Sequence, residues 1–172
     1  MKDDKYYQMV AVFYEGKFAK RSGVPYLNHI DEGMILADEL GYSLAVKQAF
    51  CLHPIFQADE ALAWSHKQEF IHDIDPYIMC LVMEYRKTAN SYLSPHTKTV
   101  DQINLSPILE VNQMLILDKV QNRKDFDLYH LGTHERSAEL DQYFRNWLAK
   151  LSVNEEEYQR LKQLILQPNM PS

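Results

Sequence analysis

Two histidines and one aspartate in this chain have side chains that could bind a divalent metal ion together. His29 and His53 lie in the first third of the sequence, and Asp118 follows much later. Neutral imidazole nitrogens and a carboxylate oxygen suit Mn²⁺, Fe²⁺, Zn²⁺ or Ni²⁺ without selecting among them. The chemistry therefore predicts a metal site at His29, His53 and Asp118, provided that three separate elements bring the side chains together.

Asp118 is the most informative of the three residues, because it lies on the apolar face of its predicted helix. An unpaired carboxylate there would cost several kcal/mol or be protonated. A metal resolves that cost, and so does Arg123 or a hydrogen-bonding partner on a neighbouring helix. Taken alone, His29 and His53 are each more typical of a structural or surface histidine. It is their combination with Asp118 that favours a site.

The elements that must position these residues are predicted to be helices. Apolar residues recur three and four positions apart, and the alternation typical of strands is absent. We expect two helices between residue 6 and Gly41, a third after Ser43 that Pro54 disrupts, and one over 59–65. Asp75-Pro76 and Ser106-Pro107 are helix starts, separated by a loop over 94–106. A mobile connection over 124–136 then precedes two C-terminal helices at about 137–167.

Composition is typical of one soluble globular domain over residues 1–172. Hydrophobic residues make up 46% and charged residues 24% of the chain. The net charge of −6 argues against broad nucleic-acid binding, which needs clustered cations. No segment resembles a signal peptide or a membrane span, and Cys51 and Cys80 have no paired spacing. We therefore expect a cytoplasmic protein with reduced cysteines and no membrane partner; the oligomeric state stays open.

Three segments between about residues 18 and 125 resemble the HD-domain phosphohydrolases. They read KRSGVPYLNH from Lys20 to His29, FCLH ending at His53, and LDKVQN around Asp118. The similarity is greatest to the branch that hydrolyses guanosine tetraphosphate in the stringent response. It implies a compact helical bundle with His29, His53 and Asp118 as metal ligands. It also implies that Arg21, Lys119 and Asn122 lie near a nucleotide.

The middle segment departs from that family. Where the family has His-Asp, two apolar residues and Glu-Asp, this chain reads HPIFQA from His53 to Ala58, so three carboxylates are missing. In the family the first binds the metal and the other two handle the attacking water. Asp59 and Glu60 lie just beyond and are candidate substitutes. The alternative is that they are the cap and first-turn acid of the next helix.

Three functions fit this pattern. The first is a divergent HD-fold protein that binds a nucleotide or phosphorylated small molecule with little or no standard hydrolysis. The second is an active metal-dependent phosphohydrolase with Asp59 or Glu60 as the base. The third is a structural adaptor with a vestigial pocket. Arg86 is a further candidate for contacting an anionic ligand, although a solvated helix face also explains it. His130 and His134 are expected in a surface turn rather than at a metal.

Overall fold

The protein is built from helices. The computed structural model describes residues 1–20 and 22–166, and within them the helices are α1 (Lys5–Tyr14), α2 (Leu27–Glu39), α3 (Leu44–Gln57), α4 (Asp59–Ser65), α5 (Pro76–Ser91), α6 (Leu109–Tyr129), α7 (Ser137–Lys150) and α8 (Glu155–Leu166). Two 3₁₀ turns span Glu69–Asp73 and Val100–Gln102. An isolated bridge joins Phe18 to Pro25, and no strand forms among the described residues. The all-α prediction is confirmed.

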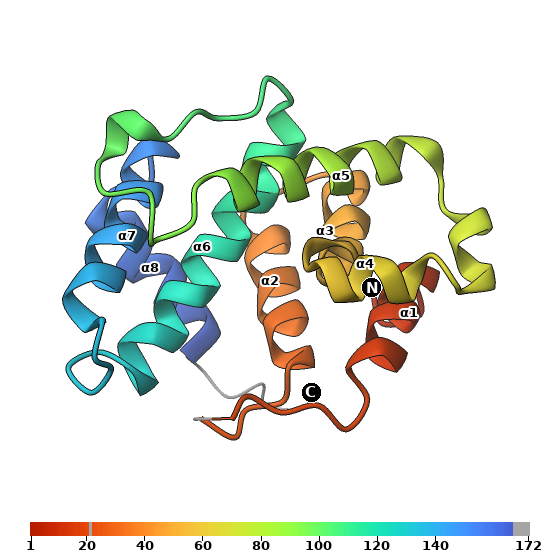
Figure 1. Ribbon diagram of the computed structural model, residues 1–172, viewed down its shortest axis with the longest axis horizontal. Helices are drawn as coiled ribbons and strands as arrows, with labels where there is room; N and C mark the ends of the chain where they lie inside the picture. The colour runs from red at the N-terminus through yellow and green to blue at the C-terminus, as the bar shows by residue number, and fades with distance from the viewer. Residues whose placement is uncertain (21, 167–172) are drawn as a thin grey trace.

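Helix α6 is the central element of the fold (Figure 1). It contacts α2, α3 and α5 on one side and α7 and α8 on the other. Helix α3 packs in turn against α1, α4 and α5. One continuous hydrophobic core includes residues from α1 through to α8, with Trp147 and Tyr158 among its largest fully buried side chains. Helices α2, α3 and α6 therefore meet in the interior, where their polar residues are shielded from water.

Several helix boundaries lie where the sequence predicted them. Ser43 caps α3 by accepting a hydrogen bond from the Val46 amide, and Asp75 caps α5 by accepting from the amides of Tyr77 and Ile78. Pro76 occupies the first turn of α5, where its missing N–H costs nothing. Gly41 ends the α2 region with a φ of 65°, a conformation that glycine adopts without steric penalty. These local signals fix where α2, α3 and α5 begin or end.

The prediction that Pro54 disrupts α3 is wrong. The helix continues through Pro54 to Gln57. Proline removes the N–H that would otherwise reach the carbonyl of Phe50 four residues earlier. That carbonyl instead accepts a hydrogen bond from Nδ1 of His53, at 2.6 Å. Because the freed acceptor has a new donor and the surrounding α3 residues are buried, the helix tolerates the proline.

The predicted limits of α6 also need correction. Ser106-Pro107 was expected to begin the helix, but Ser106 Oγ accepts from the Ile108 amide in a short turn and the helix starts at Leu109. The predicted connection over 124–136 is shorter than expected, because α6 runs on to Tyr129. Lys124 is buried and paired with Glu32 of α2, so tertiary contacts extend the helix beyond its local signals.

The structure gives no support for a membrane-spanning helix. Within the part of the chain that it describes, none of the helices combines the length and the apolar character that crossing a bilayer requires.

Candidate metal centre and its pocket

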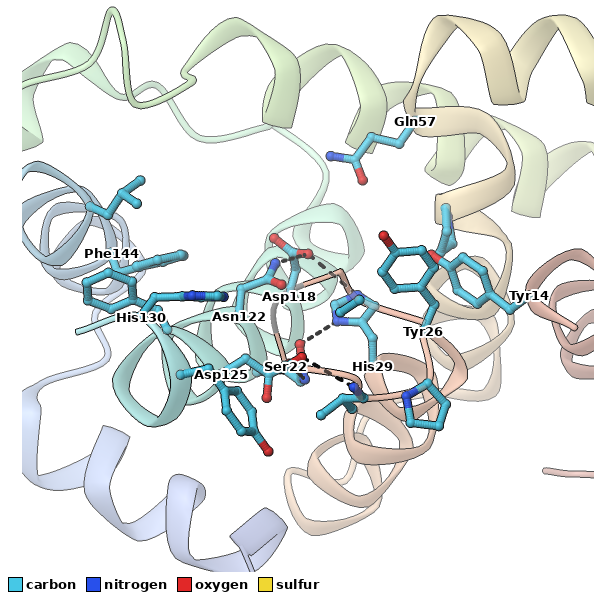
Figure 2. Close-up of a pocket in the computed structure, with 18 of the residues that line it drawn as sticks. Tyr14, Ser22, Tyr26, His29, Gln57, Asp118, Asn122, Asp125, His130 and Phe144 are labelled. Atoms are coloured by element: carbon cyan, nitrogen blue, oxygen red, sulfur yellow. Dashed lines mark hydrogen bonds and ion pairs between the residues drawn. The ribbon is translucent and has the colours of Figure 1, made fainter. Parts of the chain in front are cut away.

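The three predicted metal ligands come together from three helices. His29 lies on α2, His53 on α3 and Asp118 on α6. Nε2 of His29 is 3.2 Å from Nε2 of His53 and 3.6 Å from Oδ1 of Asp118, and the remaining His53 Nε2–Asp118 Oδ1 distance is 4.0 Å. Figure 2 shows His29 next to Asp118, with a dashed line joining the two side chains. Among the described residues, this is the group of three or more potential ligands that could hold a metal ion.

The spacing of these three atoms fits a divalent metal. A circle through them has a radius of about 2.1 Å, which matches metal–nitrogen and metal–oxygen bonds of about 2.0–2.2 Å. A single ion could therefore reach all three atoms without moving a helix. Three protein ligands would leave coordination positions for water or a bound molecule.

His53 is oriented by the carbonyl that Pro54 leaves free. Its Nδ1 lies 2.6 Å from the Phe50 carbonyl oxygen, which can only accept, so Nδ1 carries the proton. Nε2 of the neutral ring then presents a lone pair toward His29 and Asp118. The side chain is buried, with 2% of its surface exposed. This arrangement is the one that a histidine ligand needs, with one nitrogen protonated and held and the other free.

His29 is oriented by Gln121. Nδ1 of His29 lies 2.6 Å from Oε1 of Gln121. The amide of Gln121 cannot be reversed, because its Nε2 donates to Glu32 at 2.8 Å and to Asp125 at 2.9 Å, and both partners are carboxylates. Oε1 must therefore face His29 and accept a hydrogen bond from its Nδ1–H. Nε2 of His29 is left with a lone pair directed at the same point as that of His53.

Asp118 is held ionised by neighbours outside the ligand set. Asn122 donates to its Oδ1 at 2.8 Å, and the ammonium of Lys119 lies 2.8 Å from Oδ2. Oδ2 nevertheless has no donor in hydrogen-bonding alignment, and the buried hydroxyl of Tyr85 has no hydrogen-bond partner. Arg123, the partner considered from the sequence, pairs instead with Glu155 of α8. Lys119 and Asn122 are therefore the groups that compensate the buried charge of Asp118, a role for which the sequence left several candidates open.

Burial and charge set the protonation states of the centre. Burial lowers the pKa of His53 to about 3, and the adjacent His29 acts in the same direction. Burial would raise the pKa of Asp118, but Lys119 and the two imidazoles outweigh it and lower that pKa to about 2. Burial opposes the charge of Lys119, but Asp118 raises its pKa above the usual value. At neutral pH His53 is therefore neutral, and Asp118 and Lys119 form a buried ion pair.

The centre lies in the wall of a pocket of about 420 Å³, within the range of small-molecule sites. Its described lining includes the aromatic side chains of Tyr14, Tyr26, Phe126, Tyr129 and Phe144. In Figure 2, Tyr14 and Tyr26 lie beyond His29, while His130 and Phe144 lie on the opposite side of Asp118 and Asn122. None of the described lining residues is a lysine or an arginine.

The other predicted site residues are divided between the pocket and its surroundings. Asn122 lines the pocket, whereas Lys119 does not and lies 5.1 Å from the ring centroid of Trp147. Arg86 donates to the Phe56 carbonyl at 3.1 Å and also to the Gln57 carbonyl and Asp59, so it binds the end of α3. Arg21 lies outside the described residues.

Asp59 and Glu60 do not line the pocket. Asp59 opens α4 and pairs with Arg86, and its side chain is 92% exposed. Glu60 is exposed and faces a separate surface hollow beside Trp64. Both occupy the first turn of α4, so the alternative that the sequence offered holds for Glu60, whereas the N-cap is Ala58 and not Asp59. The only carboxylates that the described lining contributes are those of Asp118 and Asp125.

Sequence reasoning missed the residues that hold the ligands. Gln121, Glu32, Asp125 and the Phe50 carbonyl were not predicted to take part. A signal was present in α6, where Asp118, Gln121 and Asp125 are polar at helical spacing and so mark one polar stripe. Glu32 follows His29 by one helical turn and could have been paired with that stripe. The Phe50 carbonyl, a backbone group, leaves no mark in the sequence.

Comparisons with known proteins found no matching family model, no matching curated protein and no matching solved structure.

Proposed function

We propose that this protein binds a divalent metal through His29, His53 and Asp118 and uses the centre to hold a nucleotide or another phosphorylated small molecule. The observation that carries the proposal is the convergence of two imidazole lone pairs and one ionised carboxylate on a common point. Three acceptors without a cation between them repel one another, so the arrangement favours a bound cation. The resemblance of the same residues to the HD-domain phosphohydrolases supports this assignment.

The chemistry of the pocket supports a ligand with both an anionic and a planar part. A bound divalent ion would supply the positive charge that attracts a phosphoryl oxygen. The described lining contributes no lysine or arginine, so a bound ion would be the main positive charge that these residues present to an anion. Tyr26 and Tyr129 have 40% and 41% of their surface exposed, so their rings are available for stacking on a base.

We rank ligand binding above hydrolysis as the function, because Pro54, Gln57 and Ala58 stand where the HD-domain phosphohydrolases have acidic residues. Asp125, the one lining carboxylate besides Asp118, accepts from Gln121 and contacts the ammonium of Lys124. Each of its two oxygens therefore already contacts a neighbouring nitrogen. Hydrolysis by a rearranged set of acids is the second candidate, favoured by the coordination positions that three protein ligands leave open.

Calorimetric titration with nucleotides, with and without metal, tests the proposal. The protein is stripped with chelator and titrated with GMP, GDP and ATP, first in chelator and then with Mn²⁺. We expect saturable binding only with Mn²⁺, and its loss in His29→Gln. A matched control is His66→Gln, which removes an exposed histidine outside the pocket and should leave binding unchanged.

Each outcome of this titration bears on the proposal. Equal affinity with and without metal would contradict metal-dependent binding. Absence of binding under both conditions would favour the adaptor function. Release of phosphate with multiple turnovers in a parallel assay would overturn the order of the two candidates and favour the phosphohydrolase.

A further inference from the structure

The hydrogen-bonding partners of Gln121 determine which way its side-chain amide faces. Its side chain is almost fully buried, at 1% exposure, so water cannot replace a missing partner. Nε2 lies 2.8 Å from Oε2 of Glu32 and 2.9 Å from Oδ2 of Asp125. Turning the amide over would bring Oε1 against two carboxylates and remove the hydrogen bond that each of them accepts from Nε2. Such a reversal replaces two charge-assisted hydrogen bonds with two repulsions.

The carboxylates behind Gln121 are themselves held in place. Lys124 is buried at 3% exposure and lies 2.7 Å from Oε2 of Glu32 and 2.5 Å from Oδ1 of Asp125. Asn28 donates to the other oxygen of Glu32 at 2.8 Å. The amide direction of Gln121 is thus dictated by a packed network that joins α2 to α6, and the network places a single acceptor, Oε1, against His29.

That acceptor decides the tautomer of His29. With the proton on Nδ1, the ring donates to Oε1 over 2.6 Å. With the proton on Nε2 instead, two lone pairs would face each other across the same 2.6 Å, which is strongly repulsive. We infer that Gln121 is a positioning residue that keeps the His29 proton on Nδ1 and so leaves Nε2 free to bind the metal. The inference rests on the proposed metal centre and adds the residue that makes one of its ligands competent.

The consequence of losing Gln121 follows from the distances in the centre. Without Oε1, the neutral ring of His29 can move its proton to Nε2, where the Nε2 of His53 lies 3.2 Å away as an acceptor. A proton shared between the two rings would occupy the space that the metal needs. Metal binding would then have to expel it. Changes to residues that orient a metal-binding histidine typically cost about 10–100-fold in affinity.

Two variants separate the acceptor from the bulk of the side chain. Gln121→Met keeps the length and removes the acceptor. Gln121→Glu keeps the length and retains a carboxyl oxygen that can accept a hydrogen bond from Nδ1–H of His29. The matched control is Gln48→Met on α3, which removes the hydrogen bond to Asp4 and leaves the pocket untouched.

The test combines an NMR tautomer assignment with Zn²⁺ affinity. Long-range ¹H–¹⁵N correlation spectra of the metal-free proteins, recorded above the usual imidazole pKa, report which nitrogen of His29 carries the proton. Competition with a chromophoric chelator gives the Zn²⁺ affinity. We expect Nδ1-H in the wild type, Gln121→Glu and Gln48→Met. We expect a shift to Nε2-H in Gln121→Met, with an affinity about 10–100-fold lower.

The outcomes distinguish this inference from the proposed function. A wild-type His29 protonated on Nε2 would overturn the role of Gln121, whatever the metal does. A shifted tautomer with unchanged Zn²⁺ affinity would also overturn it. A wild-type protein that has the Nδ1-H tautomer but takes up no Zn²⁺ would refute the metal centre alone. Loss of affinity in Gln48→Met as well would show a general effect of stability, and would count against a positioning role.

Discussion

At the scale of single residues, the centre contains two buried charges, on Asp118 and Lys119, that burial would neutralise if they were not paired. Asp118 and Lys119 are adjacent in sequence, both are at least 93% buried by side chain, and the 2.8 Å pair between them keeps each ionised. Separating such a pair leaves one uncompensated charge in the interior. The pair therefore has two consequences: it keeps the carboxylate ionised, as the proposed metal site requires, and it makes that carboxylate costly to remove.

Asp118→Asn should lose metal binding and also lower the free energy of unfolding by about 3 kcal/mol or more, because Lys119 is then buried without a counter-charge. Adding Lys119→Met should recover most of the stability without restoring metal binding. Chemical denaturation of the two single variants and the double variant measures the coupling between the residues. Additive losses would show that the two side chains do not interact as the structure describes.

The free energy of unfolding should also decrease as the pH falls through a defined range. The pKa of His53 is about 3 in the folded protein, against 6.5 for an ordinary histidine, so between these values the unfolded chain binds the extra proton. Folding is therefore penalised as the pH falls from 6.5 toward 3, by about 1.4 kcal/mol per pH unit for one proton. Asp118, with a pKa of about 2 against 3.8, adds to the loss only at lower pH.

Urea denaturation in chelator, at intervals across that range, measures this slope. His53→Gln should unfold with a shallower dependence between pH 6.5 and 4, because it has no proton to gain there. Equal slopes in the two proteins would mean that His53 is not buried in its neutral form.

At the scale of elements, the approach of α2 to α3 is what brings the histidines together. Gly33 lies one turn after His29, and Phe50 lies one turn before His53. A Cβ atom added at Gly33 would be 2.1 Å from Cε1 of Phe50, far inside van der Waals contact. The absence of a side chain at Gly33 thus lets the Phe50 ring pack directly on α2 and sets the spacing of the two imidazoles.

Gly33→Ala should therefore weaken metal binding although no ligand is changed. Overpacking of this kind costs about 1–3 kcal/mol and is relieved by displacing a helix or a ring. The matched control is Gly41→Ala, where nothing lies within 4 Å of the added Cβ and only the φ of 65° is strained. Both variants should lose stability, but only Gly33→Ala should lose Zn²⁺ affinity in the chelator competition. Equal affinities would show that the helix spacing does not control the site.

The elements also show where sequence reasoning succeeds and where it stops. Ser43 and Asp75 act at the helix starts predicted for them, because capping depends on neighbours only a few residues away. Pro54 and the end of α6 were predicted wrongly, because the outcome there depends on partners in space: the His53 ring at the Phe50 carbonyl, and Glu32 for Lys124. Such partners cannot be read from local patterns.

In the site, too, the sequence predicted some features, whereas others depend on contacts in space. His29, His53 and Asp118 were predictable because residue type and order indicate a ligand set, and their convergence is confirmed. Lys119 and Arg86 were expected at a ligand, but the structure pairs them with Asp118 and with the end of α3. The direction of a side chain is set by packing, which the sequence alone does not give.

At the scale of the whole molecule, the centre depends on helices from both ends of the chain. The core continues from α1 into α7 and α8 without a break, and Trp147 and Tyr158 are fully buried in it. Arg123 of α6 is bound by Glu155 and lies over the Tyr158 ring, at 3.8 Å from its centroid. The C-terminal helices therefore hold the α6 segment that carries Asp118, although they supply no ligand.

Anomalous diffraction from crystals soaked with Zn²⁺, recorded above and below the zinc absorption edge, shows whether a metal binds at His29, His53 and Asp118. We expect one dominant peak, about 2 Å from Nε2 of His29, Nε2 of His53 and Oδ1 of Asp118, and its disappearance in Asp118→Asn crystals treated identically. Zinc bound elsewhere on the protein, with no peak among these three atoms, would contradict it.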